Sequence, residues 1–290
     1  MSLLSIPMIG LGTWLISNED AQKISTDALD LGYRHIDTAQ IYQNEEGIGH
    51  ALKESSISRE DIFITTKMWP GMYGDDTFQT FSGAIEACEQ SLKLLQLNEI
   101  DLYLIHNPFA TNSRVELWEA MIELKKQGKV KNIGVSNYNV KHIQEIEDAQ
   151  LEMPVANQIE IHPYHMVPDT LEGYMNNHNI LPIAYSTLAP LPNWREGSRW
   201  NSKPEAMKND PSIPFLEVAE KYNVTVAQLL LKWSIQLGYP VLPKSVNYKR
   251  LKENLDLNFT ITNEDMNKLS ISNKGQSLAW QEKFDPLDVD

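Results

Sequence analysis

The sequence predicts a (β/α)8 barrel, in which eight parallel strands close into a ring and helices surround them. Short aliphatic and β-branched runs alternate with segments of helical periodicity from end to end of the 290-residue chain. The strand runs are apolar throughout, as is typical of parallel strands that helices cover on both faces. About eight such units in a chain of this length suggest a single closed barrel domain spanning residues 1–290.

Eight strands are expected, each followed by a turn and then by a helix or loop. They cover residues 8–12, 35–39, 62–67, 101–106, 132–136, 155–159, 181–185 and 240–244. Apolar side chains within 85–95 fall on one helical face, as do those within 118–125. Gly128, which follows two lysines, is typical of the end of a helix. These features fit strand-helix units in regular succession.

A doubly wound open sheet is the competing architecture. It would carry a G-x-G-x-x-G turn after the first strand, where the glycines let the backbone approach a dinucleotide. Gly10 and Gly12 are present, but Leu15 stands where the third glycine belongs and Trp14 lies inside the turn. The barrel is therefore the better-supported architecture.

Two segments interrupt the rhythm of the chain. Residues 190–211 contain several prolines and two tryptophans, and they are too long for an ordinary strand-to-helix connection. Residues 273–290 form a tail after the last helical segment. We expect both to lie over the C-terminal mouth of the barrel, where active sites of this fold are built.

Charge and cysteine content limit the possible partners and compartments. With 25 basic and 39 acidic residues, the net charge of -14 disfavours attraction to nucleic acid or to an anionic membrane. Neither a signal-peptide pattern nor an apolar stretch of membrane-spanning length is present. Cys88 is the only cysteine, which excludes an intrachain disulfide. We expect a cytoplasmic protein, and a monomer, although the sequence leaves an oligomer open.

Four polar residues stand where a predicted strand ends or just beyond it: Asp37, Tyr42, Lys67 and His106. Each alone is weak evidence, because polar residues at strand ends are often structural. Together they match a proton-delivery chemistry, since a carbonyl that accepts a hydride also needs a proton on its oxygen. A tyrosine can supply that proton when a nearby ammonium favours the phenolate and an aspartate holds the ammonium in place.

The phrases around these residues resemble the aldo-keto reductase family, and the resemblance extends over nearly the whole chain. The matching phrases are GYRHIDTAQIY at 32–42, ITTKMW at 64–69 and IDLYLIH at 100–106. The resemblance implies an NADPH-dependent reduction of aldehydes or ketones, with a small-molecule carbonyl compound as substrate. It also implies that Tyr42 is the general acid, that Lys67 and Asp37 tune it, and that His106 orients the carbonyl.

The resemblance also implies a site for the nicotinamide end of NADPH or NADP+. Ser136, Asn137 and Gln158 match the family residues that bind the carboxamide, and Tyr185 matches the aromatic residue that stacks on the ring. Further matches at the cofactor site are Gly12, Thr13, Trp14, Ser186 and Leu188.

The segment 243–254 resembles the family's clamp for the adenosine 2′-phosphate and the adenine. Its matching residues are Lys244, Ser245, Val246, Asn247, Arg250, Glu253 and Asn254. Arg250 offers a bidentate fork to a phosphate and Lys244 a point charge, which favours NADP(H) over NAD(H). The alternative is that Arg250 and its neighbouring lysines form only the solvated start of a helix.

Trp14, Trp69 and Asn107 are the expected walls of the substrate pocket. Either tryptophan could instead be a packing residue, which is the commoner fate of this side chain. The family usually has His-Trp-Pro where this chain has His106-Asn107-Pro108, so we expect a roomier and more polar pocket. No metal site is expected, because the pair His162 and His165 lacks the spacing and the carboxylate of a known metal motif.

Two other functions stay open at this point. A non-catalytic subunit that senses the redox state of NADP(H) would need the cofactor site but not a complete proton donor. An alcohol dehydrogenase would use the same residues in the reverse direction, since a catalyst accelerates both directions of a reaction.

Overall fold

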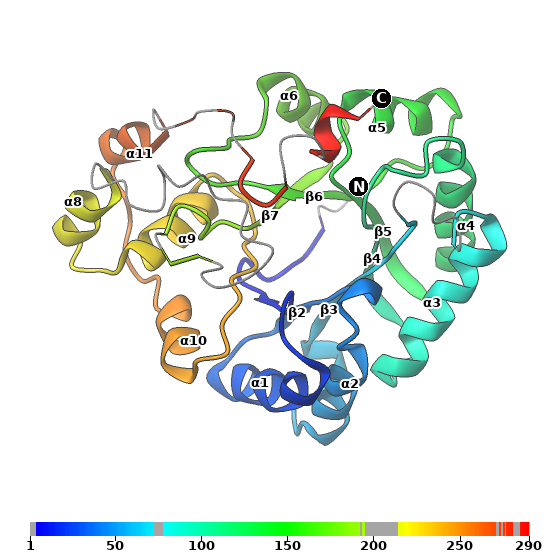
Figure 1. The fold of residues 1–290 in the computed structure, drawn as a ribbon, viewed down its shortest axis with the longest axis horizontal. Coiled ribbons are helices and arrows are strands. Elements are labelled where there is room, and N and C mark those ends of the chain that lie inside the picture. The colour runs from blue at the N-terminus through cyan, green and yellow to red at the C-terminus, as the bar shows by residue number, and fades with distance from the viewer. Residues whose placement is uncertain are drawn as a thin grey trace.

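Parallel strands hydrogen-bonded in chain order form the centre of the computed structural model (Figure 1). The structure describes residues 4–71, 78–191, 193–194, 214–270, 273, 275, 277–280 and 285–289. Within these residues the strands are β1 (Leu11–Gly12), β2 (His35–Asp37), β3 (Phe63–Met68), β4 (Ile100–Ile105), β5 (Val130–Ser136), β6 (Ala156–Glu160) and β7 (Leu181–Tyr185). The uninterrupted parallel order rules out the doubly wound sheet, whose strand order reverses.

An extended segment at 240–243 closes the barrel between β7 and the start of the chain. Val241 forms parallel bridges to both sides, and its N–H donates to the Met8 carbonyl at 2.9 Å. On the other side, the Ala184 N–H donates to the Pro240 carbonyl at 2.8 Å. Pro240 and Pro243 have no N–H to donate, which explains why the predicted eighth strand is a pair of bridges instead of a regular ladder. The prediction of a closed barrel is confirmed.

Helices surround this ring of strands, as the sequence periodicity predicts (Figure 1). They are α1 (Asn18–Leu31), α2 (Glu45–Glu54), α3 (Phe81–Leu95), α4 (Arg114–Lys126), α5 (Val140–Asp148), α6 (Asp169–Asn177), α8 (Pro214–Lys221), α9 (Val226–Gln236), α10 (Tyr248–Leu255) and α11 (Asn263–Ser270). Short 3-10 helices cover Gln40–Tyr42, Arg59–Asp61 and Pro286–Asp288. Gly128 has a φ of 72° directly after α4 and donates to the Lys125 carbonyl, so the predicted helix end is confirmed.

Side chains inside the barrel change from apolar to polar along the strand direction. Leu102, Leu104, Ala156, Ile183 and Leu242 form a buried cluster that joins β4, β6, β7 and the closing segment. Successive side chains of a strand point to opposite faces, so Gln158 and Glu160 lie on the same side of β6 as Ala156 but nearer its C-terminal end. The same alternation carries Asp37 and Lys67 inward from β2 and β3. The fold thus gathers polar groups at one end of an apolar interior.

The C-terminal segment lies over this polar end. Ser277 hydrogen-bonds the Glu160 side chain, and the Trp280 indole hydrogen-bonds the Tyr185 hydroxyl at 2.6 Å. The predicted position of the tail is therefore confirmed for these residues. Most of the other predicted insertion, 190–211, falls outside the described residues. None of the helices in the described part of the chain has the length and apolar character needed to cross a membrane.

Candidate active site

A buried ion pair lies at the C-terminal end of the barrel interior. Lys67 Nζ is 2.6 Å from Asp37 Oδ1 and also donates to the Thr38 carbonyl at 2.7 Å. Burial lowers the pKa of Lys67, and the charge of Asp37 opposes this effect. Burial likewise raises the pKa of Asp37, against the charge of Lys67. Because neither side chain is appreciably exposed, the two charges depend on each other for stabilisation.

Gln158 supplies a second hydrogen bond to the Asp37 carboxylate, from a strand on another part of the barrel. Its Nε2 donates to Asp37 Oδ2 at 2.7 Å, and the two residues are 121 positions apart in the chain. Each carboxylate oxygen of Asp37 therefore accepts a hydrogen bond from a different strand. Gln158, which the sequence assigns to the cofactor site, thus also holds Asp37, one of the four predicted catalytic residues.

Tyr42 lies above the ion pair in a row of aromatic rings. Lys67 Nζ is 5.1 Å from the centroid of the Tyr42 ring. The Tyr42 ring is 4.8 Å from that of Trp14 and 5.6 Å from that of His106, between centroids. Trp69 continues the row at 5.1 Å from His106. The structure therefore brings together all four predicted catalytic residues and both predicted tryptophan walls.

His106 is held in its neutral form. Burial, together with the positive charge of Lys67, lowers the pKa of His106 well below its usual range. A neutral imidazole carries one N–H donor and one acceptor nitrogen. At neutral pH this side chain can donate a hydrogen bond to a carbonyl oxygen without adding a second positive charge beside Lys67.

The predicted nicotinamide residues form one hydrogen-bonded cluster beside His106. Asn137, with a φ of 63°, donates from Nδ2 to the His106 carbonyl and to Ser136 Oγ, each at 3.0 Å. Ser136 Oγ in turn donates to the Gln158 carbonyl at 2.7 Å. The Tyr185 hydroxyl donates to Asn137 Oδ1 at 2.7 Å, and its side chain is half-buried. Amide and hydroxyl groups of this kind fit a ligand that has both a donor and an acceptor, such as a carboxamide.

The other predicted cofactor residues near β1 and β7 also lie at the mouth. Thr13 is buried and donates its hydroxyl to the Asp37 carbonyl at 2.9 Å. A Cβ atom on Gly12 would come within 2.5 Å of the Leu242 carbonyl oxygen, so only glycine fits there. Ser186 directly follows β7 with a φ of 54°, and Leu188 packs against the main core.

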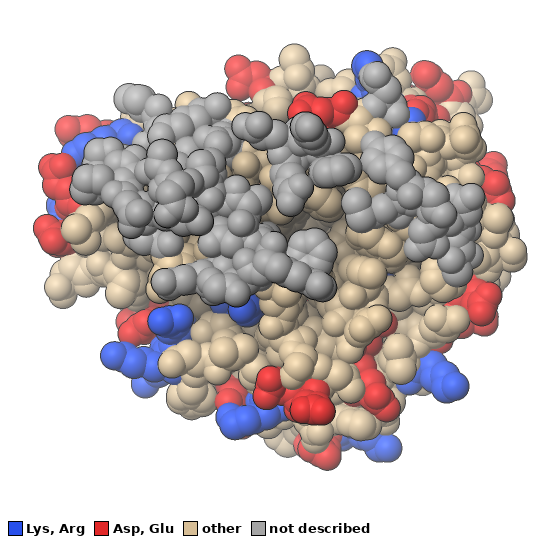
Figure 2. Space-filling view, in the orientation of Figure 1, with Lys and Arg blue, Asp and Glu red and all other residues tan. Residues whose placement is uncertain are grey.

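The predicted adenosine clamp lies at the start of α10. Asn247 caps this helix by accepting from the Arg250 N–H at 3.2 Å, and Ser245 Oγ accepts from the Asn247 N–H at 3.1 Å. Lys244 and Arg250 are exposed, and Figure 2 shows Lys and Arg atoms gathered over the place that α10 takes in Figure 1. This local positive charge suits a phosphate on an otherwise acidic protein.

The remaining clamp residues differ in exposure. Val246 is 60% exposed, whereas Asn254 is buried beside Tyr33. Glu253 is half-buried, and its carboxylate lies 3.8 Å from the ammonium of Lys249 in the same helix. The contacts of these three residues with a cofactor stay predictions.

Asn107 lies deeper than a pocket wall would. None of its surface is exposed, its Nδ2 donates to the Gly71 carbonyl at 3.4 Å, and its Oδ1 accepts from the Phe109 N–H at 3.0 Å. The amide thus links two backbone segments, and its contact with a substrate stays a prediction.

The sequence model of the Aldo/keto reductase family matches residues 8–274. The chain belongs to this family. Methylglyoxal reductase of Escherichia coli is 38% identical over 276 residues, which cover 94% of this chain and 92% of the relative. Glycerol 2-dehydrogenase (NADP(+)) of Saccharomyces cerevisiae is 36% identical, over 98% of this chain and 93% of its own length. The Bombyx mori aldo-keto reductase in complex with NADP superposes with a TM-score of 0.81 at 31% identity, covering 94% of this chain and 91% of that one.

Membership in the aldo/keto reductase family confirms the class of enzyme predicted from the strand-end phrases. The relatives are named as a reductase and as a dehydrogenase, and two of the names include NADP. The use of NADP(H) within this family is therefore confirmed.

Sequence reasoning missed several residues that organise the mouth of this aldo/keto reductase. Asn44 is buried, accepts from the Thr38 hydroxyl at 2.7 Å and donates to the carbonyls of Thr13 and Ile16. Gln40 accepts from the Trp69 N–H at 3.0 Å. Gln40 and Asn44 lie two positions before and after Tyr42, and this proximity to a predicted catalytic residue is the sequence feature that could have indicated them. Within the described ranges, no group of three or more His, Cys, Asp or Glu side chains is placed to hold a metal ion.

Proposed function

We propose that this aldo/keto reductase reduces an aldehyde or ketone to an alcohol with NADPH, and that Tyr42 delivers the proton. The observation that carries the proposal is the position of Lys67, whose ammonium is 2.6 Å from Asp37 and 5.1 Å from the centre of the Tyr42 ring. An ammonium fixed beneath a phenol stabilises the negative charge that develops when the phenol gives up its proton.

His106 has a complementary part in this proposal. Its ring centre lies 5.6 Å from that of Tyr42, and its lowered pKa keeps it neutral. A neutral N–H donor polarises a carbonyl oxygen and orients it toward the hydroxyl of Tyr42. The substrate carbonyl then receives hydrogen bonds from two directions, while the flanking tryptophans, Trp14 and Trp69, limit the access of water.

The nicotinamide end of the cofactor would be held by the hydrogen-bonded cluster beside His106. Ser136, Asn137 and Gln158 would bind the carboxamide, and the half-buried ring of Tyr185 would cover one face of the nicotinamide. When bound, NADPH supplies the hydride that the carbonyl carbon accepts. The hydrogen bond from Gln158 to Asp37, 2.7 Å long, would hold the residues that bind the carboxamide at a fixed distance from the residues that deliver the proton.

We propose NADPH in preference to NADH because Arg250 and Lys244 are exposed cations near the capped start of α10. A phosphate dianion gains charge-assisted hydrogen bonds there that a ribose hydroxyl cannot form. The relatives named for methylglyoxal and for glycerol suggest small oxygenated compounds as the first substrates to examine. We propose that reduction is the main direction, since cells generally keep NADP(H) pools reduced.

The experiment is a turnover assay of the purified protein with NADPH and a panel of methylglyoxal, simple aldehydes, ketones and sugars. We expect loss of NADPH absorbance with at least one carbonyl compound, formation of the corresponding alcohol by mass spectrometry, and weaker turnover with NADH. Tight NADPH binding without turnover on any member of the panel would contradict the proposal and favour a redox-sensing subunit.

A further inference from the structure

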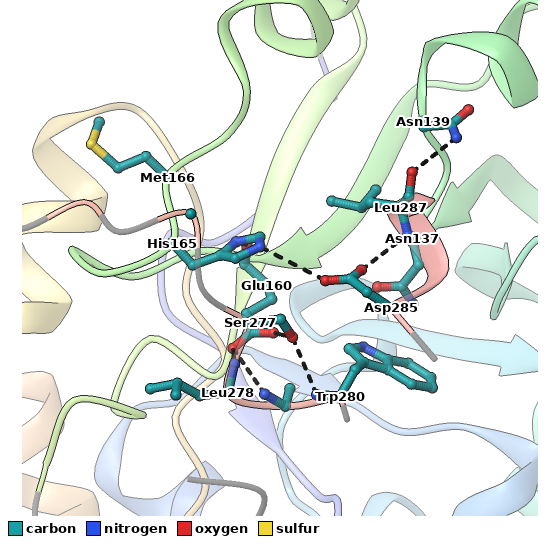
Figure 3. Close-up of polar contacts among 12 residues, drawn as sticks. Asn137, Asn139, Glu160, His165, Met166, Ser277, Leu278, Trp280, Asp285 and Leu287 are labelled. Atoms are coloured by element: carbon teal, nitrogen blue, oxygen red, sulfur yellow. Dashed lines mark hydrogen bonds and ion pairs between the residues drawn. The ribbon is translucent and has the colours of Figure 1, made fainter. Parts of the chain in front are cut away.

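Buried polar side chains hold the segments at the mouth of the barrel in place. The Glu160 carboxylate anchors the C-terminal segment, since it accepts from the backbone N–H groups of residues 278 and 279 at 2.8 and 3.0 Å and from the Ser277 hydroxyl at 2.7 Å (Figure 3). The loop that carries Tyr42 is held in a comparable way by Asn44, which has no exposed surface.

The loop between β2 and α2 is exposed on both sides of Tyr42. Tyr42 itself is half-buried, whereas its neighbours Ile41 and Gln43 are exposed. Gln43 also has a φ of 57°, in the left-handed region. Because the two neighbours bury little apolar surface, the position of Tyr42 depends on the hydrogen bonds that fix the ends of its loop.

Asn44 closes this loop and ties it to the chain that follows β1. Its Oδ1 accepts from the Thr38 hydroxyl at 2.7 Å, across the base of the loop. Its Nδ2 donates to the carbonyls of Thr13 and Ile16 at 2.9 and 3.0 Å. Carbonyl oxygens only accept hydrogen bonds, so the nitrogen must face these two and the oxygen must face Thr38. Both protons of the amide are therefore used.

Thr38 connects the closed loop to the buried ion pair. Its hydroxyl binds Asn44, and its carbonyl oxygen accepts from Lys67 Nζ at 2.7 Å. Thr13 makes a second connection, because its N–H and its hydroxyl donate to the Asp37 carbonyl at 3.1 and 2.9 Å. The Asn44 amide thus joins its loop to the backbone that surrounds the ion pair.

The two carbonyl partners of Asn44 also bracket Trp14 in the sequence. Thr13 directly precedes Trp14, and Ile16 follows it by two positions. The ring of Trp14 lies 4.8 Å from that of Tyr42, between centroids. One amide therefore fixes the loop of the proposed proton donor together with the segment that carries its aromatic neighbour.

We propose that Asn44 is a positioning residue for the reaction, which holds the Tyr42 hydroxyl in place relative to the Lys67 ammonium by closing the loop 38–44. The inference rests on the proposed function, because it takes Tyr42 as the proton donor. Asn44 is neutral, so it fastens the loop without adding a charge beside the ion pair of Lys67 and Asp37.

The test measures how the rate of a single turnover with bound NADPH depends on pH, for the panel compound that is reduced fastest. The wild-type rate should fall at alkaline pH, where Tyr42 loses its proton. Asn44→Ala opens the loop and moves the phenol away from the ammonium that favours the phenolate. The midpoint of the alkaline fall should then rise by about one pH unit, toward the value of an ordinary tyrosine, and the rate at pH 7 should drop roughly tenfold or more. The ionisable neighbours Asp37, Lys67 and His106 are unchanged in this variant.

A second variant, Thr38→Val, removes the same loop closure from its other end. It keeps the shape of the side chain and the carbonyl that binds Lys67, and it should raise the midpoint by about half a unit. The double variant should lose little more than Asn44→Ala alone, because the two residues share one hydrogen bond.

Gln228→Ala is the matched control. Gln228 is also a buried amide, which donates to the Asp256 carbonyl at 2.7 Å and accepts from the Thr225 N–H at 2.9 Å in another part of the fold. This control should lower the free energy of unfolding, measured in urea, and leave the alkaline midpoint unchanged.

A loss of stability in Asn44→Ala with an unchanged alkaline midpoint would overturn the inference, since the residue would then serve only the fold. An equal shift of the midpoint in Gln228→Ala would overturn it as well, and so would fully additive effects in the double variant. If Asn44→Ala does not fold, the Thr38→Val result decides. Absence of turnover in the wild-type protein would instead contradict the proposed function.

Discussion

Lys67 is a fully buried ammonium group, and its position depends on one carboxylate. The Asp37 side chain accepts from Lys67 on one oxygen and from Gln158 on the other. Burial disfavours each charge of the ion pair, as the directions of both pKa values indicate. A buried charge left without its partner destabilises a protein strongly. We propose that the pair serves the chemistry of Tyr42, whose ring centre lies 5.1 Å from the ammonium.

Replacement of Lys67 by methionine should remove most of the activity, and it should also lower the stability of the fold, because Asp37 is then buried without its partner. Methionine fills a similar volume without the charge, so proton transfer from Tyr42 loses its electrostatic support, and kcat should fall by roughly 100- to 10,000-fold. Steady-state kinetics measures the loss of kcat, and thermal unfolding followed by circular dichroism measures the change in stability. Asp37→Asn is the complementary variant, since it keeps Lys67 but weakens its hold. A Lys67→Met protein with near-normal kcat would contradict the role of the ammonium.

Among the single elements, α10 has one side that packs against the barrel and another side that carries exposed positive charge. Its first turn is capped by Asn247, and its exposed cations face solvent, while Leu251 and Asn254 are buried on the opposite side. One short helix thus packs against the barrel and also presents positive charge at its start.

Arg250→Met should weaken the binding of NADPH more than that of NADH. We expect a difference of about 1.5 to 3 kcal/mol, the range for a hydrogen bond to a charged group. Dissociation constants of both cofactors, measured by fluorescence titration, give this difference directly. Lys252→Met removes a charge from the same helix at a position that is not among the predicted clamp residues, and it serves as the control. Equal losses for both cofactors would mean that Arg250 belongs only to the solvated face.

The strand ends were the part of the site that the sequence could predict. Asp37 and Lys67 stand at fixed positions in short local phrases, so their chemistry is visible without knowledge of the loops. Asn107 is different, because its amide binds Gly71, 36 positions away. The anchor of the tail by Glu160 joins residues 117 to 119 positions apart, and no local pattern announces such a contact.

For the whole molecule, the barrel interior determines how stability responds to pH. His35 lies inside the barrel, with Nε2 3.0 Å from Thr65 Oγ1. Burial and the charge of Lys67 lower its pKa to about 3. The unfolded chain binds a proton at this histidine near pH 6.5, whereas the folded chain does not. The contribution of His35 to stability is therefore present above pH 6.5 and is lost progressively as the pH falls toward 3.

The variant His35→Asn isolates this effect from other titrating groups. Its loss of unfolding free energy relative to the wild-type protein should be largest near pH 7. It should shrink by roughly 2 kcal/mol by pH 5, because each pH unit below 6.5 is worth about 1.4 kcal/mol for one such group. Urea unfolding at several pH values measures the gap. A gap that stays constant across this range would show that His35 does not remain neutral in the folded protein.

The fold as a whole was predictable because its signal repeats along the chain. Apolar strand runs and helical segments alternate from Leu11 to Leu269, and each repeat supports the same barrel. The ends of the ring were less predictable. β1 is shorter than the apolar run around it, and the prolines of the closing segment allow only isolated bridges, a consequence of missing N–H groups.

The most direct test of the central claim compares Tyr42→Phe with the wild-type protein in two measurements, the dissociation constant of NADPH and the kcat for the best carbonyl substrate. Tyr174→Phe, which loses a surface hydroxyl bonded to Glu147, is the control. The account predicts that Tyr42→Phe binds NADPH within about twofold of the wild type and loses at least roughly 100-fold in kcat. A Tyr42→Phe protein that still turns over at a rate close to the wild type would show that another group delivers the proton.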